Sequence, residues 1–382
     1  MKTILLISPY WKEDHRWMVS SYKLADLWER LGYRVVVAAM GSETKPLTNL
    51  HGNLFLATRK DWFLKDPWNY GISFGFTGFV LKLAAEEKPD IVVVNKILFW
   101  SSLASISLRL RGYKVLQMTD ALVGMTWWPR GRIPKVCAAI YAWTIGWLLL
   151  GIAKRVVFFH PQPPSILRKL GIEAKSMVIP TGIDLQGYGL GMGVRDEINP
   201  NPNPQPSTLN ITYVGRLESV KGVDDFLAAA VTVKKEHPEL NIQVAGWAKP
   251  HHPLLSQYSE SVSFLGLRGD IADLLAHTHI FVLPSHSEGL SNALMEAMAS
   301  GCACIASDVG GNRFLIQNGV SGFLFPAGDR SALASYIRKL VEDQSKRRSL
   351  GEKARQRIEE VFSWKKVGEQ YGLLFDAWTT NR

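Results

Sequence analysis

Two carboxylates and a polar helix start lie close together in the second half of the chain. Glu288 precedes a helical pattern, and Glu296 follows eight residues later, a little over two turns, so both can face one side. A carboxylate only accepts hydrogen bonds and can bind two neighbouring hydroxyls, which suits a sugar or ribose. On spacing alone, the two acids could equally be a solvated helix acid and a partner of the helix dipole.

The residues around these acids predict a strand–loop–helix–strand unit. The apolar runs at 280–283 and 302–306 are typical of buried strands. Between them, the helical pattern puts a set of apolar residues on one face: Leu290, Leu294, Ala297 and Met298. Ser291 and Asn292 add polar groups at the start of this helix, where free backbone amides attract phosphate.

Two cations follow an earlier predicted strand, at 211–214. Gly215-Arg216-Leu217 comes directly after that strand, and Lys221-Gly222 follows. The glycines allow the backbone to turn sharply, and Arg216 and Lys221 then lie at the rim of the sheet. Fixed cations there could stabilise the charge that a diphosphate leaving group gains in a transition state. A solvated charged loop is the alternative.

The whole unit resembles the donor-binding signature of the GT4 family, retaining glycosyltransferases with the GT-B fold. The matching residues, in order, are Glu288-Gly289, Glu296, Ala299-Ser300-Gly301 and Gly310-Gly311. Gly215, Arg216 and Lys221 are similar to the family's diphosphate clamp. The resemblance implies a nucleotide-diphosphate sugar as co-substrate, with no metal and no other cofactor.

The resemblance also implies roles for single residues. Glu296 should accept hydrogen bonds from the ribose, and Glu288 should contact the transferred sugar. Gly289, Leu290, Ser291 and Asn292 should contact sugar and phosphate, and Leu267, in Gly266-Leu267-Arg268, should lie near the base. An ordinary turn explains residues 266–268 equally well. The catalytic set implied in this way is Glu288, Asp120, Lys221 and Arg216.

The first half departs from the family pattern. The predicted strand 114–118 ends in Thr119-Asp120, where family members often carry a His-Asp pair, so the imidazole is missing. Pro9-Tyr10-Trp11 replaces a Gly-Gly, and Arg313-Phe314 replaces the Pro-Glu that usually follows Gly310-Gly311. Besides Asp120, the acceptor-side candidates are therefore Glu13, His15 and Arg16, in a loop after the first strand.

Strands and helices alternate along the chain, which predicts two Rossmann-like domains with doubly wound parallel sheets. By the resemblance they face each other across a cleft, as in GT-B proteins. The predicted strands of the first half are 3–8, 34–39, 53–57, 91–95, 114–118 and 155–159, and its helices lie near 19–31, 73–87, 99–111, 135–152 and 163–170. The predicted strands of the second half are 211–214, 241–245, 262–264, 280–283 and 302–306, with helices at 223–235, 270–276, 330–343, 346–361 and 366–378.

The expected domain boundaries follow from composition and from the resemblance. Residues 1–184 form an acceptor-binding domain, and 185–209, rich in Gly, Pro and Asn, form a flexible linker. Residues 210–365 form the donor-binding domain. The helix 366–382 is expected to pack back on the first domain, as it does in the family.

The positive charge of the chain lies in its first half. Residues 1–184 hold 24 Lys and Arg against 13 Asp and Glu, whereas residues 185–382 hold 20 against 21. Such a basic half could bind nucleic acid, an anionic membrane or an anionic substrate. No zinc-finger or RRM-like signature supports nucleic acid.

The three cysteines indicate no disulfide framework, and the N-terminal apolar run is too short for a signal peptide, which predicts a cytoplasmic protein.

Residues 136–153 are eighteen residues without a charge, preceded by Trp127, Trp128, Arg130, Arg132 and Lys135. Three interpretations remain open: a membrane-spanning helix, a buried core helix, or a helix half sunk in a membrane surface. Spanning would split the first domain, and the tryptophans and cations are typical of an interface. The favoured prediction is peripheral binding of 127–155 to an anionic membrane, on its inner face.

These observations predict a glycosyltransferase that moves a sugar from a nucleotide-diphosphate sugar to a hydroxyl of a membrane-associated or lipid-linked glycan, with retention of configuration. Three alternatives stay open. They are a transferase for a soluble acceptor, a sugar-nucleotide epimerase or phosphorylase, and a catalytically silent nucleotide-sugar-binding subunit.

Overall fold

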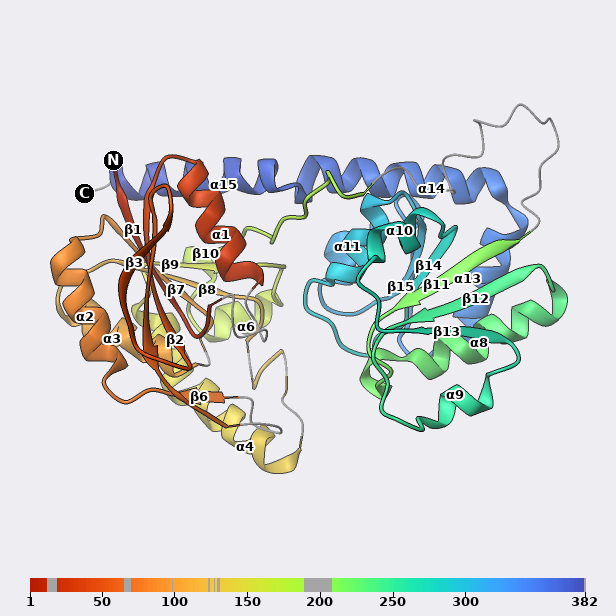
Figure 1. The fold of residues 1–382 in the computed structure, drawn as a ribbon, viewed down its shortest axis with the longest axis horizontal. Helices are drawn as coiled ribbons and strands as arrows, with labels where there is room; N and C mark the ends of the chain where they lie inside the picture. Colours follow the sequence, from red (N-terminus) through yellow and green to blue (C-terminus); the bar gives the residue numbers. More distant parts are fainter. Residues whose placement is uncertain are drawn as a thin grey trace. The chain divides into compact units, whose positions relative to one another are not determined.

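The structure, a computed structural model, describes residues 1–11, 19–64, 70–97, 99–122, 124–126, 128, 131–188 and 208–380. It divides into two compact units (Figure 1). Unit 1 is Met1–Thr181 with Val367–Arg382, and unit 2 is Gly182–Lys366. The acceptor-side candidates Glu13, His15 and Arg16 lie outside the described residues, as do Trp127, Arg130 and most of the expected linker.

Unit 1 is built on an eight-stranded sheet with the order β10-β9-β8-β7-β1-β2-β4-β3. Its strands are β1 (Thr3–Ser8), β2 (Arg34–Gly41), β3 (Lys45–His51), β4 (Leu54–Lys60), β7 (Ile91–Asn95), β8 (Val115–Thr119), β9 (Arg155–Phe158) and β10 (Ser176–Val178). Neighbouring strands run parallel, except that β3 pairs antiparallel with β4. The central strands β1 and β7 are buried along nearly their whole length, as their apolar runs predicted.

The helices of unit 1 agree with the sequence pattern to within a few residues. They are α1 (Val19–Arg30), α2 (Phe76–Glu87), α3 (Ala104–Leu110), α4 (Arg132–Tyr141), α5 (Trp147–Ile152) and α6 (Pro164–Lys169). A π-helical stretch, η3 (Ala142–Gly146), joins α4 to α5, so that Arg132–Ile152 is one continuous helix. The C-terminal helix α15 (Trp364–Thr380) contributes Tyr371 and Phe375 to this unit, where their rings pack edge-on against Trp28 at 5.4 and 5.3 Å.

Three features of unit 1 were not predicted from the sequence. Strand β3 is largely exposed and polar, a small hairpin, β5 (Trp62–Leu64) with β6 (Tyr70–Ile72), follows β4, and β10 has only three residues. All are short or solvated, so no apolar alternation marks them. Their pairing with neighbours, rather than local sequence, makes them strands.

Unit 2 carries a six-stranded, all-parallel sheet with the order β13-β12-β11-β14-β15-β16. Its strands are β11 (Leu209–Val214), β12 (Leu240–Ala245), β13 (Val262–Gly266), β14 (Ile280–Leu283), β15 (Ala303–Ser307) and β16 (Phe323–Phe325). The chief helices are α8 (Val223–Glu236), α10 (Ile271–Ala276), α11 (Asn292–Ala299), α13 (Arg330–Glu342) and α14 (Gln344–Arg357). Short helices α9 (Pro253–Gln257) and α12 (Asn312–Leu315) and strand β16 were not predicted.

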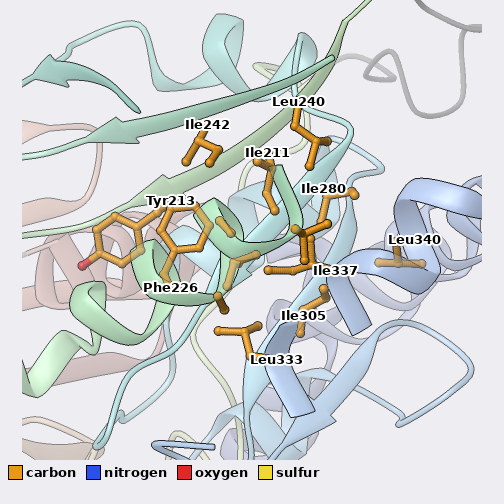
Figure 2. Close-up of a cluster of buried hydrophobic side chains, with 14 of the residues drawn as sticks. Ile211, Tyr213, Phe226, Leu240, Ile242, Ile280, Ile305, Leu333, Ile337 and Leu340 are labelled. Carbon is orange, nitrogen blue, oxygen red and sulfur yellow. The ribbon is translucent and has the colours of Figure 1, made fainter. Parts of the chain in front are cut away.

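Both faces of the unit 2 sheet are covered by helices, because successive side chains on each strand point to opposite sides. Ile280 and Val282 of β14 join the core formed with α8 and α13, whereas Phe281 and Leu283 join the core formed with α11 and α14. Figure 2 shows the first core, where Ile211, Tyr213 and Ile280 face Phe226 of α8 and Leu333 and Ile337 of α13. The predicted α/β class with Rossmann-like parallel sheets is confirmed for both units.

The end of the expected linker needs one correction. Residue 209 is the first residue of β11, where its backbone pairs with β12, so the strand begins before residue 210.

Both Cys302 and Cys304 are buried, and burial raises the pKa of each thiol. They behave as small apolar residues.

Phe226→Ala should lower the free energy of unfolding by about 3–5 kcal/mol, because it empties a fully buried aromatic position between α8 and the sheet. Val320→Ala, at a residue that is 52% exposed, should change it by less than about 0.5 kcal/mol. Urea denaturation followed by circular dichroism measures both. Equal losses would show that this core does not stabilise unit 2.

Candidate functional site

The strand order of unit 2 reverses direction between β11 and β14. From β11 the chain winds outward to β12 and β13, and it then returns to the other side of β11 to form β14, β15 and β16. In open parallel sheets, ligands bind at the carboxyl ends of the strands at such a switch point. The loops that follow β11 and β14, residues 215–222 and 284–291, hold most of the predicted donor-binding residues.

The loop after β11 is held close to the sheet by its glycines. The Tyr213 hydroxyl donates to the Arg216 carbonyl at 2.9 Å, and a Cβ on Gly215 would lie only 2.6 Å from that hydroxyl. Burial, and after it the nearby Glu288 carboxylate, raises the pKa of Tyr213 and keeps its phenol protonated. A side chain at 215 would therefore displace the loop that carries Arg216.

Lys221 and Glu288 form a direct ion pair across the switch point. Their Nζ and Oε1 atoms are 2.7 Å apart, and the side chains are only 23% and 10% exposed. The Ser285 hydroxyl donates to the same carboxylate oxygen at 2.8 Å, and the His286 amide donates to the Val220 carbonyl at 2.9 Å. Lys221 and Glu288 were predicted to make separate contacts with the ligand, whereas in the structure each side chain also holds the other in place.

Arg216 is held far less tightly. Its Nη1 lies 3.0 Å from Glu218 Oε1, and the arginine side chain is 54% exposed. Exposed ion pairs of this kind contribute about 0–1 kcal/mol to the free energy of unfolding. The guanidinium can therefore leave Glu218 for an anionic ligand at little cost.

The start of α11 is built by the predicted signature. Ser291 is the N-cap residue, and its hydroxyl accepts from the Leu294 amide at 3.4 Å. The Gly311 amide donates to the Gly289 carbonyl at 3.1 Å, and a Cβ on Gly310 would lie 1.9 Å from the Glu288 carbonyl oxygen. The Gly-Gly pair thus lets the loop after β15 lie directly against Glu288-Gly289 and hold the helix start in place.

Glu296, in the second turn of α11, contacts Tyr188. Burial raises the pKa of the Tyr188 phenol to about 12, and the charge of Glu296 and its hydrogen bond to this hydroxyl add to the effect. Arg355 Nη1 donates to the Tyr188 carbonyl at 2.8 Å and to the Ala299 carbonyl at 2.7 Å. Tyr188 lies in the segment that was predicted to be a flexible linker, and no local sequence signal distinguishes it.

A second contribution that the sequence did not reveal comes from α8. Asp225, only 6% exposed, accepts from Arg330 Nε at 2.6 Å and lies 3.1 Å from His286 Nε2. This carboxylate therefore fastens the loop after β14 to the first turn of α8. It supports the position of Glu288 without belonging to any recognised motif.

Leu267 is the predicted donor contact that lies farthest from this group. It follows β13 and is 80% exposed, and β12 separates β13 from β11. Its neighbour Arg268 pairs with Asp270. Residues 266–268 therefore lie at the same edge of the sheet as the other predicted residues, but not at the switch point.

In unit 1, three titratable side chains meet at the carboxyl ends of neighbouring strands. Lys96 follows β7, Asp120 follows β8, and His160 lies just beyond β9. Lys96 Nζ is 2.6 Å from Asp120 Oδ2, with the lysine side chain 10% exposed. Lys96 has φ +70°, a left-handed conformation that is strained for a residue with a side chain.

The interpretation that the imidazole is missing here needs correction. His160 is buried, and both the backbone and the carboxylate of Asp120 favour its charged form, although burial dominates and lowers its pKa. Burial alone would raise the pKa of Asp120, but the Lys96 ammonium outweighs it and lowers that pKa. An anionic Asp120 thus lies beside the Lys96 ammonium and the ring of His160, a residue that follows β9 and that sequence spacing could not place here.

The continuous helix Arg132–Ile152 is long and apolar enough, by length and composition, to cross a membrane. Only 28% of its most apolar 18-residue stretch is buried. Its buried face consists largely of small residues, among them Pro134, Ala138, Ala142 and Gly146. Its exposed face carries larger apolar side chains: Ile133, Val136, Ile140, Trp143, Ile145, Trp147 and Leu148. This apolar exposed face is unusual for a helix of a protein surrounded only by water.

Gly310→Ala should lower the free energy of unfolding by about 2–4 kcal/mol, since it combines left-handed backbone strain with a backbone collision. The matched control is Gly319→Ala. Gly319 also has a left-handed φ, +78°, but its added Cβ would meet nothing within 4 Å. The control should lose only about 1 kcal/mol. Equal losses in urea denaturation would contradict the close packing of 310–311 on 288–289.

His160 should make stability depend on pH. Its folded-state pKa lies below the ordinary 6.5, so between the two values the unfolded chain binds more protons. The free energy of unfolding should therefore fall as the pH falls from about 7 to about 5. His160→Gln should flatten this slope and the exposed His251→Gln should not, measured by urea denaturation across the pH range. An unchanged slope in His160→Gln would contradict the assignment.

Comparison with known proteins covers both units. Residues 194–357 match the family described as Glycosyl transferases group 1, and residues 19–186 match the one described as Glycosyltransferase Family 4. The chain resembles the sucrose-phosphate synthase of Thermosynechococcus elongatus in structure, with a TM-score of 0.78, 21% identity and complete coverage of both chains. At that identity the likeness shows the fold.

Two curated relatives match over part of the chain. The N-acetyl-alpha-D-glucosaminyl L-malate synthase of Bacillus anthracis is 36% identical over 116 residues, which is 30% of each protein. The UDP-Gal:alpha-D-GlcNAc-diphosphoundecaprenol alpha-1,3-galactosyltransferase of Escherichia coli is 28% identical over 211 residues, 52% of this chain and 54% of that protein. The matched segments thus span between about a third and about half of these relatives. With both family matches and the two parallel-sheet units, the chain belongs to the GT4 family of glycosyltransferases and has the GT-B fold.

Proposed function

We propose that this protein transfers a sugar from a nucleotide-diphosphate sugar to a hydroxyl of a membrane-associated or lipid-linked glycan, with retention of configuration. The observation that carries the proposal is the switch point of unit 2. There, Lys221, Arg216 and the capped start of α11 gather beside a carboxylate, Glu288, that is held in place by Lys221 and by the Ser285 hydroxyl.

The chemistry follows from where charge develops. When the bond between the sugar and the donor breaks, the bond electrons go to the departing diphosphate. Groups that bind this charge more strongly than they bind the intact donor lower the barrier. Lys221 is a fixed cation, Arg216 can turn toward the ligand, and the amides at the start of α11 add partial positive charge.

The acceptor hydroxyl then attacks from the face that the diphosphate leaves, which retains the anomeric configuration. Its proton passes to an oxygen of the departing phosphate, so no protein base is required. In this scheme Glu288, oriented by Lys221 and Ser285, accepts hydrogen bonds from sugar hydroxyls. We propose that no metal ion takes part, because the cations and backbone amides of unit 2 stabilise the negative charge of the departing diphosphate.

Glu296 is proposed to bind the ribose of the donor. Its carboxylate is held by the Tyr188 hydroxyl, and Arg355 holds the backbone of Tyr188. A carboxylate kept in one orientation can accept from two neighbouring hydroxyls with little loss of side-chain entropy. In unit 1, we propose that Asp120, kept anionic by Lys96, binds hydroxyls on the acceptor side.

The membrane part of the proposal is supported by the exposed face of Arg132–Ile152. Tryptophans and aliphatic side chains share that face, and Trp128 beside it is 46% exposed. Cations flank the helix, and Lys169 Nζ lies 4.6 Å from the ring centre of Trp143. Such a surface suits the boundary of an anionic membrane, on its cytoplasmic side. The partial relative from Escherichia coli, whose name states a diphosphoundecaprenol-linked acceptor, is consistent with this placement.

Glu296→Gln should weaken binding of the donor about tenfold, since a neutral amide replaces a carboxylate acceptor. Lys221→Ala should lower turnover by about 2–4 kcal/mol in activation free energy. Glu352→Gln and Lys249→Ala, two exposed changes of the same chemistry, are the controls. Isothermal titration with UDP-, GDP- and ADP-sugars and release of the nucleoside diphosphate measure both effects.

The same assays separate the alternatives. A transferase releases nucleoside diphosphate from its donor in step with transfer to an acceptor, whereas an epimerase changes the sugar without consuming the nucleotide sugar. A silent subunit binds the donor and never cleaves it. Variants at 296 and 221 that bind and react like their controls would overturn the site.

A further inference from the structure

A second positively charged site lies in unit 1, away from the acceptor-side residues. A groove of about 570 Å³ runs between α3 and α5, where β8 and β9 begin. Three cations line it, Arg109, Lys114 and Lys154, together with apolar side chains that include Leu110, Leu148 and Ile152. None of the described residues that line it is acidic.

The cations of this groove are held near one another. Burial, followed by the nearby Lys114 and the charges of Arg155 and Arg109, lowers the pKa of Lys154. Arg109 Nη1 donates to the Tyr113 carbonyl at 2.9 Å, and Lys154 Nζ lies 5.1 Å from the ring centre of Trp378. Neighbouring like charges repel each other, and an anion between them would relieve the repulsion.

The base of the groove is also fixed. Lys175 Nζ donates to the carbonyls of Gly151 and Ala153 at 2.6 and 3.0 Å, which satisfies the end of α5 and adds a positive charge beside it. The groove therefore has a fixed base, with Arg109 and Lys154 partly buried in it and Lys114 exposed at its rim.

Apolar side chains rim the same hollow. Leu110, at the end of α3, is 83% exposed, and Leu148 of α5 is 42% exposed. Leu148 belongs both to the groove and to the apolar face of Arg132–Ile152, so the two surfaces are continuous. A free phosphate would use the cations alone and leave this apolar rim exposed to water.

We propose that this groove binds the phosphate headgroup of an anionic phospholipid, with the start of its acyl chains against Leu110, Leu148 and Ile152. The inference rests on the membrane-binding part of the proposed function and adds a specific headgroup site to it. Charge complementarity selects the anionic headgroup, and continuity with the apolar face of the helix selects a lipid.

This lipid would be an anchor and not the reacting acceptor. Lys114 precedes β8 and Asp120 follows it, so the groove and the acceptor-side residues lie at opposite edges of the sheet. Six extended residues separate them by about 20 Å. A lipid held in the groove would fix the orientation of unit 1 on the membrane.

The test uses the full chain and sedimentation with vesicles of phosphatidylcholine alone or mixed with phosphatidylglycerol. Lys114→Gln/Lys154→Gln should bind the mixed vesicles about tenfold or more weakly than the wild type. Lys249→Gln/Lys353→Gln removes the same charge from exposed positions of unit 2 and should change binding far less. Lys114→Gln alone, at an exposed residue, guards against a folding defect at Lys154, and thermal unfolding checks all variants.

Two further arms identify the ligand. Leu110→Gln should weaken binding to mixed vesicles if acyl chains enter the groove. Inorganic phosphate, compared with chloride at equal ionic strength, should not displace the protein from them. Equal binding by the two double-lysine variants would overturn the headgroup site, and so would displacement by inorganic phosphate.

The membrane part of the proposed function has a separate readout. Trp143→Ala/Trp147→Ala should weaken binding to both kinds of vesicle, because it removes apolar contact from the exposed helix face. If the wild type fails to bind either vesicle, the membrane proposal and the inference both fail. If the wild type and the tryptophan variant behave as expected but the double-lysine variant matches its control, the headgroup site alone fails.

Discussion

The ion pair between Lys221 and Glu288 is the interaction on which the proposed site depends. It joins the loops that follow two neighbouring strands, at the point where the strand order of unit 2 reverses. Each partner is largely buried, so neither charge would be tolerated there without the other or a ligand. The glycines at 222 and 310, both with a left-handed φ, bring the surrounding backbone segments into contact and make the pair possible.

In unit 1, too, titratable side chains gather at the carboxyl ends of parallel strands. Lys96, Asp120 and His160 are brought together by three adjacent parallel strands and not by closeness in the sequence. The Lys96 ammonium keeps Asp120 anionic, and the buried ring of His160 lies beside this pair. At the opposite edge of this sheet, the basic groove beside an apolar helix face gives unit 1 a second charged surface.

Much of this could be predicted from the sequence, because it depends on local pattern. Apolar runs such as 280–283 marked the buried strands, and Glu288-Gly289 with Gly310-Gly311 marked the start of α11. The contacts of Tyr188, Asp225 and His160 could not be predicted, since each partner is distant in the chain and has no motif of its own. Strand β3 and the hairpin of β5 and β6 escaped because their pairing comes from tertiary packing.

The most direct test of the central claim is a crystal structure of the protein with UDP or GDP. The account predicts a diphosphate within hydrogen-bonding distance of Lys221 Nζ and Arg216 and above the amides at the start of α11. The Lys221–Glu288 contact should lengthen as the lysine turns to the phosphate. A nucleotide bound at any other edge of unit 2, with this ion pair unchanged, would contradict it.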